Sequence, residues 1–505
     1  MKNYSRRDFI KNSMLGATAI SATPLLSSFP VSLHSTKREL VFRPFPHPQM
    51  PPLTWAYAAD ESEDPFKSPL SVTREGIIVP EEMPDKKFSI NARWFVEGFG
   101  YTWLSANNRG KFYSLGDHPG NEALNLNYEF ASSRVARNND VLKNYRRTGT
   151  EFSPEVRHLV DLSEEFLEDA SKQSANDERC AARADRALYY SLIAGETIER
   201  ENAKSEIARF KKRQAYFGCE SRQFVWAKSE EFAKRFTDLM RFATVTHYVW
   251  DSWYELFEPT ERRYNWGIKD DIVAWLREND ITIQGRPLFW FHPSVTPDWL
   301  KQKNFDQLKV YVDHHARDLV SHYGDKVLQW EVMNEYHDRA NIHNHTPEQT
   351  VEITRLACDT VKDANPNVIR ILNHCAPWAE YVAEGKMAGM PGTRPLRSPR
   401  RFVQELIEAG VDFDVLGIQI YFPQRDLSDI ARMLERLAVF GKPIYITEIG
   451  ASSDLFAANP SGSIVGKPSE PYAWHRHWDE ELQADWLEQV YTLYYSKSYV
   501  KAINW

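Results

Sequence analysis

Two stretches of the sequence combine a run of strand-forming residues with a glutamate at its end. In residues 326–336, KVLQWEVMNEY, the apolar run ends in Asn334 and Glu335. In residues 442–450, KPIYITEIG, a β-rich run is closed by Glu448. Parallel strands open onto one cleft at their carboxyl ends, so both carboxylates are expected at the same place. Two carboxyl groups in one cleft can act as an acid and a base or nucleophile.

Cleavage of a glycosidic bond needs two such groups in different protonation states. One protonated carboxyl donates to the leaving oxygen, and one carboxylate attacks or stabilises the anomeric centre. A separation of about 5 Å would indicate the retaining, double-displacement route. Asn334 fits because its amide could bind a sugar 2-hydroxyl as the oxocarbenium ion develops. Taken alone, either glutamate is equally well explained as an ordinary strand-terminal charge in water.

The elements that would position these residues form an alternation of strands and helices after Arg213. Eight strands are predicted, at residues 215–219, 242–247, 282–290, 327–334, 368–374, 415–421, 444–448 and 499–505. Seven helices are predicted between them, at residues 230–240, 268–279, 305–323, 347–364, 400–409, 427–440 and 480–496.

Repeated units in this number predict a (β/α)8 TIM barrel over residues 214–505. Glu335 would then end the fourth strand and Glu448 the seventh. A doubly wound sheet is the alternative, but no strand is followed by a glycine-rich phosphate loop. Because the sequence stops inside the eighth strand, we expect the last unit to be truncated.

Three segments precede the predicted barrel. Residues 1–35, with Arg6-Arg7 before a mildly apolar stretch, are similar to a twin-arginine signal, which predicts export to the periplasm or the extracellular space. Residues 39–150 show short apolar alternations between turn residues and predict a β-sandwich, one alternation being residues 124–130. Residues 151–213 are charged with helical spacing and predict a helical connector.

The aromatic residues of the predicted sandwich allow two interpretations. They could offer a sugar-stacking face, as in carbohydrate-binding modules, or they could fill the core. The residues concerned are Tyr101, Trp103 and Tyr113.

Composition limits the partners that we expect. The 505 residues, 42% of them apolar, suffice for two domains with a large core. A net charge of −8, with both signs interspersed, disfavours nucleic acid as a partner. Outside the N-terminal stretch, no segment approaches the length of a membrane span. The four cysteines and the histidine clusters lack metal-ligand spacing, so neither a metal nor a cofactor is predicted.

Five segments resemble, in order, the motifs of family 10 glycoside hydrolases, the xylanase family. They lie at residues 258–266, 285–299, 330–335, 416–419 and 446–448. The resemblance covers residues 215–505 and implies a divergent member, with Glu335 as general acid/base and Glu448 as nucleophile. It implies that Asn334 binds the 2-hydroxyl. Further substrate-binding residues are expected at Trp290, Arg286, Gln419, Tyr421 and Trp505, and at His374 because it ends the fifth predicted strand.

The sequence also departs from the family pattern around the expected sugar site. Residues 246–253 lack the acid, amide and lysine that grip the glycone sugar in the family. Arg286 and Tyr421 stand where the family has histidines, and Gly450 stands where it has an acid.

Three functions follow from these observations. The first is a retaining, endo-acting hydrolase of β-1,4-linked polysaccharide such as xylan. The second is a related barrel glycosidase for another sugar or linkage. The third is a non-catalytic carbohydrate-binding protein on a degenerate barrel.

Overall fold

The computed structural model describes residues 38–505, except residues 119, 176, 223–228, 251–255, 338, 388–395, 452 and 454–471. The predicted export signal at residues 1–35 lies outside the described residues.

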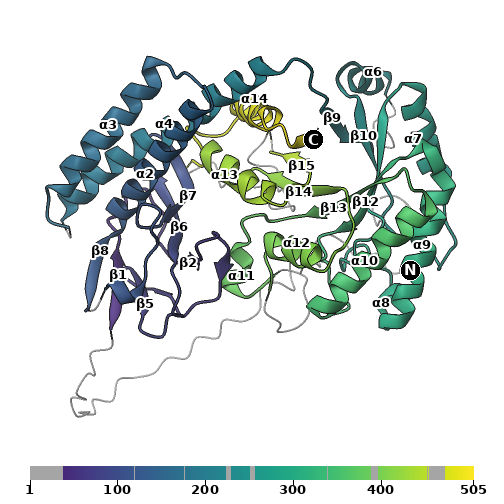
Figure 1. The fold of residues 1–505 in the computed structure, drawn as a ribbon, viewed down its shortest axis with the longest axis horizontal. Helices are drawn as coiled ribbons and strands as arrows, with labels where there is room; N and C mark the ends of the chain where they lie inside the picture. Colours follow the sequence, from purple (N-terminus) through teal and green to yellow (C-terminus); the bar gives the residue numbers. More distant parts are fainter. Residues whose placement is uncertain are drawn as a thin grey trace, which may run out of the picture. The chain divides into compact units, whose positions relative to one another are not determined.

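Eight parallel strands close into a barrel in the C-terminal part of the chain (Figure 1). In chain order they are β9 (Tyr216–Glu220), β10 (Phe242–Thr246), β11 (Thr282–Arg286), β12 (Gln329–Asn334), β13 (Ile369–His374), β14 (Val415–Tyr421), β15 (Ile444–Gly450) and β16 (Val500–Asn504). The last strand, β16, pairs with the first, β9, and completes the ring. The predicted (β/α)8 barrel is confirmed, and each predicted strand is present.

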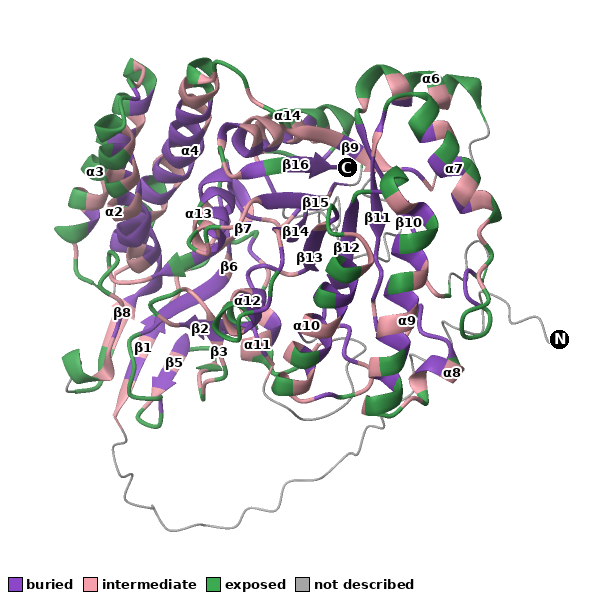
Figure 2. Cartoon of the chain, turned by 45° about the vertical axis from the view of Figure 1, so that its right-hand side comes forward, coloured by how far each residue is buried: buried purple, intermediate pink, exposed green. Residues whose placement is uncertain are grey.

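Helices between these strands cover the outside of the barrel, with buried faces toward the strands and exposed faces outward (Figure 2). The seven predicted helices are observed as α6 (Glu230–Leu239), α7 (Gly267–Glu278), α9 (Phe305–Tyr323), α10 (Pro347–Ala364), α12 (Pro399–Glu408), α13 (Leu427–Ala438) and α14 (Glu480–Ser496). Two short helices, α8 (Asp298–Lys301) and α11 (Glu380–Glu384), lie in the strand-to-helix connections. The start of α10 is fixed by a capping box between Thr346 and Gln349.

Two four-stranded sheets form the N-terminal region. The first has the order β4-β5-β1-β8, with β1 (Glu39–Arg43), β4 (Ser71–Val72), β5 (Ile77–Pro80) and β8 (Glu122–Asn125). The second has the order β3-β2-β6-β7, with β2 (Ala56–Ala59), β3 (Pro65–Phe66), β6 (Ser89–Val96) and β7 (Gly100–Ala106).

The strand predicted at residues 124–130 is wrong beyond Asn125. The Asn125 side chain accepts a hydrogen bond from the backbone N–H of Tyr128 and caps helix α2 (Leu126–Arg147). An asparagine at this position satisfies a donor of the first helical turn, so the chain turns into a helix where the alternation predicted a strand.

Helix α2 is followed by α3 (Pro154–Ser171) and α4 (Glu178–Arg209). Residues 38–505 form one compact unit, and a single apolar cluster includes residues from the sheets, from α4 and from the barrel. Tyr113 is 2% exposed and donates a hydrogen bond to Glu129, so it belongs to this core and to no sugar-stacking face.

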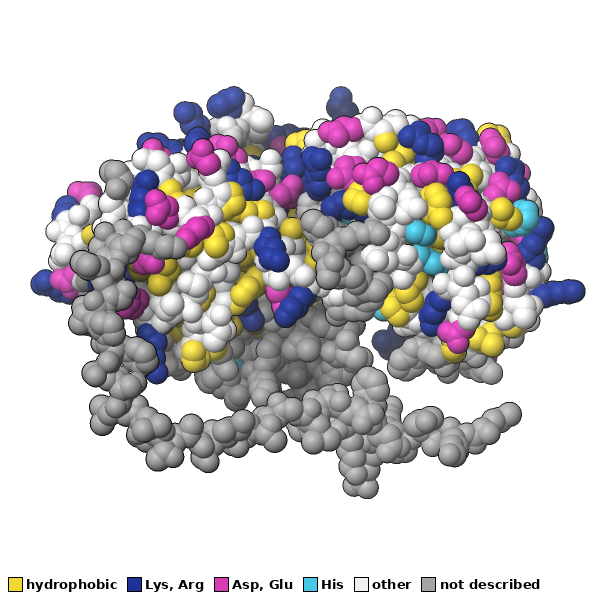
Figure 3. Space-filling view, turned by 90° about the horizontal axis from the view of Figure 1, so that it is seen from below, with side chains coloured by type: hydrophobic (Ala, Val, Ile, Leu, Met, Phe, Trp, Pro, Cys, Tyr) yellow, Lys and Arg dark blue, Asp and Glu magenta, His cyan; other side chains and the backbone are white. Residues whose placement is uncertain are grey.

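The described surface carries charges of both signs. On the face shown in Figure 3, Lys and Arg side chains are interspersed with Asp and Glu. None of the described helices combines the length and the hydrophobicity needed to cross a membrane.

Candidate active site

A cavity of about 820 Å³ opens at the carboxyl ends of the barrel strands. Its lining comes from strand ends and the loops that follow them, which explains why residues distant in the sequence meet there. The residues expected from the sequence that line it are Arg286, Trp290, Glu335, Gln419, Tyr421, Glu448 and Trp505.

Glu335 directly follows β12 and is 4% exposed. Its φ of 54° turns the chain, and its backbone N–H donates to the carbonyl of Asn373 at 2.8 Å. Its Oε1 accepts a hydrogen bond from Gln419 at 2.8 Å, and its Oε2 accepts one from the Trp290 indole at 2.9 Å. These contacts hold the carboxyl group in one orientation.

Burial raises the pKa of Glu335 above its ordinary value, although the nearby Arg339 cation lowers it. The Arg339 guanidinium lies 3.2 Å from Oε2. Because the effect of burial is the larger, the site favours the protonated form that a general acid requires.

Glu448 lies on β15 and contacts a cation and two neutral donors. Its Oε1 accepts a hydrogen bond from the Arg286 guanidinium at 2.6 Å and a longer one from Asn373 at 3.4 Å. Its Oε2 accepts a hydrogen bond from the Tyr421 hydroxyl. Arg286 and Tyr421 thus bind one oxygen each of Glu448, and these charge-assisted and neutral hydrogen bonds fix its orientation.

A third carboxyl group, Glu331, is completely buried beneath the cavity. Burial raises its pKa to about 8, against the opposing effect of Arg286, whose Nε lies 3.8 Å from the Glu331 Oε2. The Asn373 amide donates to Glu331 at 3.2 Å and to the Asn334 side chain at 3.2 Å. Arg286 and Asn373 thus connect Glu331 to Glu448.

Asn334 is 1% exposed, and its side-chain oxygen also accepts a hydrogen bond from Gln419 at 3.3 Å. The oxygen is therefore occupied by two amide donors. This arrangement fixes the orientation of the Asn334 amide next to Glu335.

His374, which was expected to bind substrate, is not among the residues that line the cavity. It is 1% exposed and packs edge-on against Phe402 of α12 at 5.8 Å. Successive strand residues point to opposite sides, so its neighbour Asn373 is the β13 residue that faces the barrel interior.

Four residues of the site were not predicted from the sequence: Glu331, Asn373, Arg339 and Tyr248. A charged residue within the apolar run of β12 was a signal for Glu331, because an unpaired buried charge is strongly disfavoured. The signal for Asn373 was the alternation of side chains along β13, which places either His374 or its neighbour inside the barrel. Tyr248 follows β10 and lies 5.1 Å from Trp290, ring to ring, a contact that only the folded chain reveals.

Within the described part of the chain, no group of three or more His, Cys, Asp or Glu residues could hold a metal ion.

Comparisons with known proteins concern mainly the barrel. The family model "Glycosyl hydrolase family 10" matches residues 208–504. Endo-1,4-beta-xylanase B of Thermotoga neapolitana is 27% identical over 230 residues, which cover 43% of this chain and 61% of that protein. Endo-1,4-beta-xylanase C of Paenibacillus barcinonensis is 24% identical over 223 residues, covering 39% of this chain and 19% of that protein.

Among solved structures, xylanase 10B from Thermotoga petrophila RKU-1 in complex with xylobiose is 21% identical, with a TM-score of 0.43. The match covers 61% of this chain and 84% of that chain. The matched part of this chain spans less than two thirds of each of the two curated relatives.

Proposed function

The chain belongs to glycosyl hydrolase family 10, and on that basis we propose that it is a retaining, endo-acting hydrolase of β-1,4-linked polysaccharide such as xylan. One observation carries the mechanism: Glu335 and Glu448, which lie at the ends of two different strands of the barrel, line the same cavity. Burial raises the pKa of Glu335, which suits a proton donor, whereas Arg286 and Tyr421 bind both oxygens of Glu448 and hold it in one orientation. We therefore assign Glu335 as the acid and Glu448 as the nucleophile.

In the first step, Glu335 donates its proton to the glycosidic oxygen as the bond to the anomeric carbon breaks. The Glu448 carboxylate attacks that carbon and forms a glycosyl ester. Arg286 and Tyr421 hold Glu448 in position for this attack. In the second step, the Glu335 carboxylate takes a proton from water as the water attacks the anomeric carbon, and Glu448 leaves as a carboxylate.

The test is hydrolysis of xylan and a panel of other neutral β-glycans by the full chain, with products identified by size and anomeric configuration. We expect shortened chains whose new reducing ends are first released with the β configuration. Glu335→Gln and Glu448→Gln should each lower kcat by about 10²-fold or more, because the proton donor or the nucleophile is lost.

Glu408→Gln is the matched control, since Glu408 is an exposed residue on α12 outside the cavity. Its turnover should equal that of the unchanged protein. Normal turnover in either cavity variant, or release of the α configuration, would contradict the proposal.

A related glycosidase for another sugar or linkage is the second candidate. Arg286 and Tyr421 contact Glu448 directly, where the family has histidines, so the surroundings of the reacting sugar differ. Activity on a panel member other than xylan, lost in Glu335→Gln, would favour this candidate. Oligosaccharide binding without product would favour the non-catalytic one.

We also propose that the protein is exported by the twin-arginine route, on the basis of Arg6-Arg7. Replacing both arginines by lysine should leave the protein in the cytoplasmic fraction of a producing bacterium. Unchanged export of that variant would contradict the proposal.

A further inference from the structure

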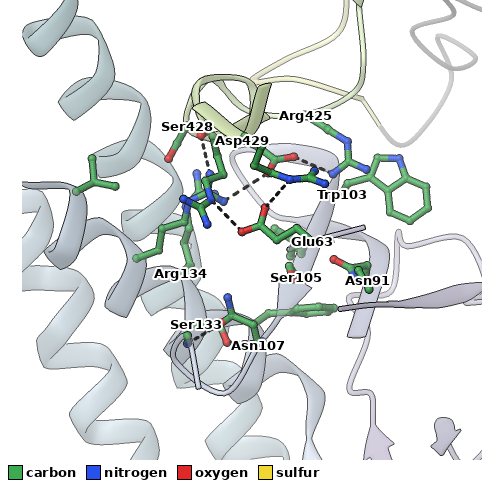
Figure 4. Close-up of a pocket in the computed structure, with 18 of the residues that line it drawn as sticks. Glu63, Asn91, Trp103, Ser105, Asn107, Ser133, Arg134, Arg425, Ser428 and Asp429 are labelled. Atoms are coloured by element: carbon green, nitrogen blue, oxygen red, sulfur yellow. Dashed lines mark hydrogen bonds and ion pairs between the residues drawn. The ribbon is translucent and has the colours of Figure 1, made fainter. Parts of the chain in front are cut away.

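A second cavity, of about 370 Å³, lies between the N-terminal sheet β3-β2-β6-β7, helix α2 and helix α13 (Figure 4). Its walls come from segments that are distant in the sequence, such as Asn91 of β6, Ser133 of α2 and Ser428 of α13. The volume is in the range of ligand pockets, roughly 300–1,000 Å³.

Several arginines that line this cavity are paired with carboxylates. Arg137 lies 3.4 Å from Asp429, Arg425 lies 2.8 Å from the same carboxylate, and Arg432 lies 2.9 Å from Glu63. Each of these arginines therefore has a carboxylate partner within the fold. A charged ligand would have to separate such a pair, so an uncharged ligand suits the wall better.

Uncharged hydrogen-bonding side chains line the other sides of this cavity. Figure 4 shows Asn91, Ser105, Asn107 and Ser133 around the open space beneath Glu63. Ser105 is exposed although its strand neighbours Leu104 and Ala106 are buried, so its side chain faces the cavity and not the core. Asn91 donates within its sheet, and Ser133 and the Asn107 oxygen each accept a backbone N–H. The Ser105 hydroxyl and the Asn107 amide nitrogen are left to face a ligand, and such neutral groups suit hydroxyl groups.

The outer nitrogens of two buried arginines on the cavity wall are also occupied. The Nε atoms of Arg134 and Arg425 have no hydrogen-bond partner, and both residues are 7% exposed. Both Nε atoms are closed off from the cavity, so a ligand would meet only the outer nitrogens of these two arginines, which already bind carboxylates. Trp103 adds an aromatic ring to the wall, and rings of this kind pack against the apolar faces of sugars.

We propose that this cavity is a second carbohydrate-binding site, which takes a neutral sugar residue of an oligosaccharide and breaks no bond in it. Trp378 lines both this cavity and the catalytic cavity, so the two sites share a wall. The site extends the proposed function because it binds carbohydrate outside the catalytic cleft.

The experiment uses the full chain with Glu335→Gln, so that the ligand stays intact during the measurement. Titration calorimetry with xylohexaose, and separately with cellohexaose, should show two binding sites for at least one probe. Adding Ser105→Trp, which fills the cavity from β7, should weaken one site by at least about tenfold and leave the other unchanged. Ser174→Trp is the control, because it places the same ring on an exposed turn after α3.

Ser105→Ala is the second variant, which removes a hydroxyl group without filling space, and it should weaken the same site. In the background with Glu335 intact, Ser105→Trp should leave hydrolysis of a short soluble substrate unchanged, which separates this proposal from the catalytic one. A single site for both neutral probes, or a second site that neither cavity variant weakens, would overturn the proposal. If the second site bound an acidic oligosaccharide but neither neutral probe, the proposal of a neutral ligand would be overturned.

Discussion

Arg286 is the residue that contacts two carboxyl groups at the base of the cavity. Its guanidinium contacts Glu448 at 2.6 Å and approaches Glu331 at 3.8 Å, and the residue itself is 5% exposed. Among the described residues, neither carboxyl group forms an ion pair with another cation. Removing Arg286 would therefore leave Glu448 without its charged partner in a poorly solvated place.

We predict that Arg286→Gln lowers kcat by about 10²-fold, because a preorganised electrostatic contact to the reacting group is lost. Steady-state kinetics on the hydrolysed substrate check this value. Arg317→Gln, on the exposed side of α9, is the matched control and should show normal kcat. Equal kcat in both variants would show that Arg286 has only a structural role.

Glu331 predicts how stability depends on pH. Its folded-state pKa of about 8 is above its ordinary value, so between about pH 4.5 and 8 the folded state binds the extra proton. The stabilisation is complete at the acid end of this range and is lost as the pH rises through 8, by at most about 1.4 kcal/mol per pH unit.

Glu331→Gln keeps a neutral side chain at every pH, so its free energy of unfolding should rise relative to the unchanged protein as the pH increases from 5 to 9. Chemical denaturation at several pH values measures the difference. Asp185, whose pKa burial raises to about 7, titrates in both proteins and cancels in this comparison. If the difference in free energy of unfolding stayed constant from pH 5 to 9, the raised pKa of Glu331 would be refuted.

Among the elements, β11 must lie close to β12, and a glycine permits this approach. A Cβ atom at Gly285 would lie 2.3 Å from the ring of Trp330, which is completely buried beneath the site. The glycine is thus required by packing, because the ring has no free space into which to move.

We predict that Gly285→Ala lowers the free energy of unfolding by about 1–3 kcal/mol or more, since it overpacks the barrel core. Thermal or denaturant unfolding checks this. Gly267→Ala is the control, because no atom lies within 4 Å of its added Cβ at the start of α7. The control should be neutral or slightly stabilised, and an equal loss in both would exclude the packing explanation.

The elements also show what could be predicted from the sequence. Apolar runs and helical periodicity located all eight barrel strands, because a closed parallel barrel buries its strands completely. It was harder to predict which side of a strand each residue faces. His374 and Asn373 are neighbours, and only the register of β13 decides which side chain lies inside the barrel. Arg286 and Glu448 are 162 residues apart in the sequence and meet only because the barrel closes. No local sequence pattern predicts such a contact.

At the scale of the whole molecule, a buried ion pair joins the N-terminal region to the barrel. Arg134 of α2 contacts Asp426, and the residues are 7% and 0% exposed. Asp426 also caps α13 by accepting hydrogen bonds from the backbone N–H groups of Ser428 and Asp429. One carboxylate therefore fixes both the helix start and the contact between regions.

We predict that Arg134→Met destabilises the protein by roughly 3–5 kcal/mol, because Asp426 is left as a buried charge without its partner. Adding Asp426→Ser should restore much of this loss, since serine keeps the helix cap without the charge. Denaturant unfolding of the two single variants and the double variant gives the coupling energy. Additive losses would contradict the proposed pairing.

Tyr421 and Gly450 are paired across β14 and β15, and both differ from the family pattern. A Cβ atom at position 450 would lie 3.1 Å from the Tyr421 ring, so an acid there would crowd the tyrosine that donates to Glu448. A side chain at position 450 would have to displace the Tyr421 ring, so the tyrosine that donates to Glu448 and the glycine opposite it depend on each other.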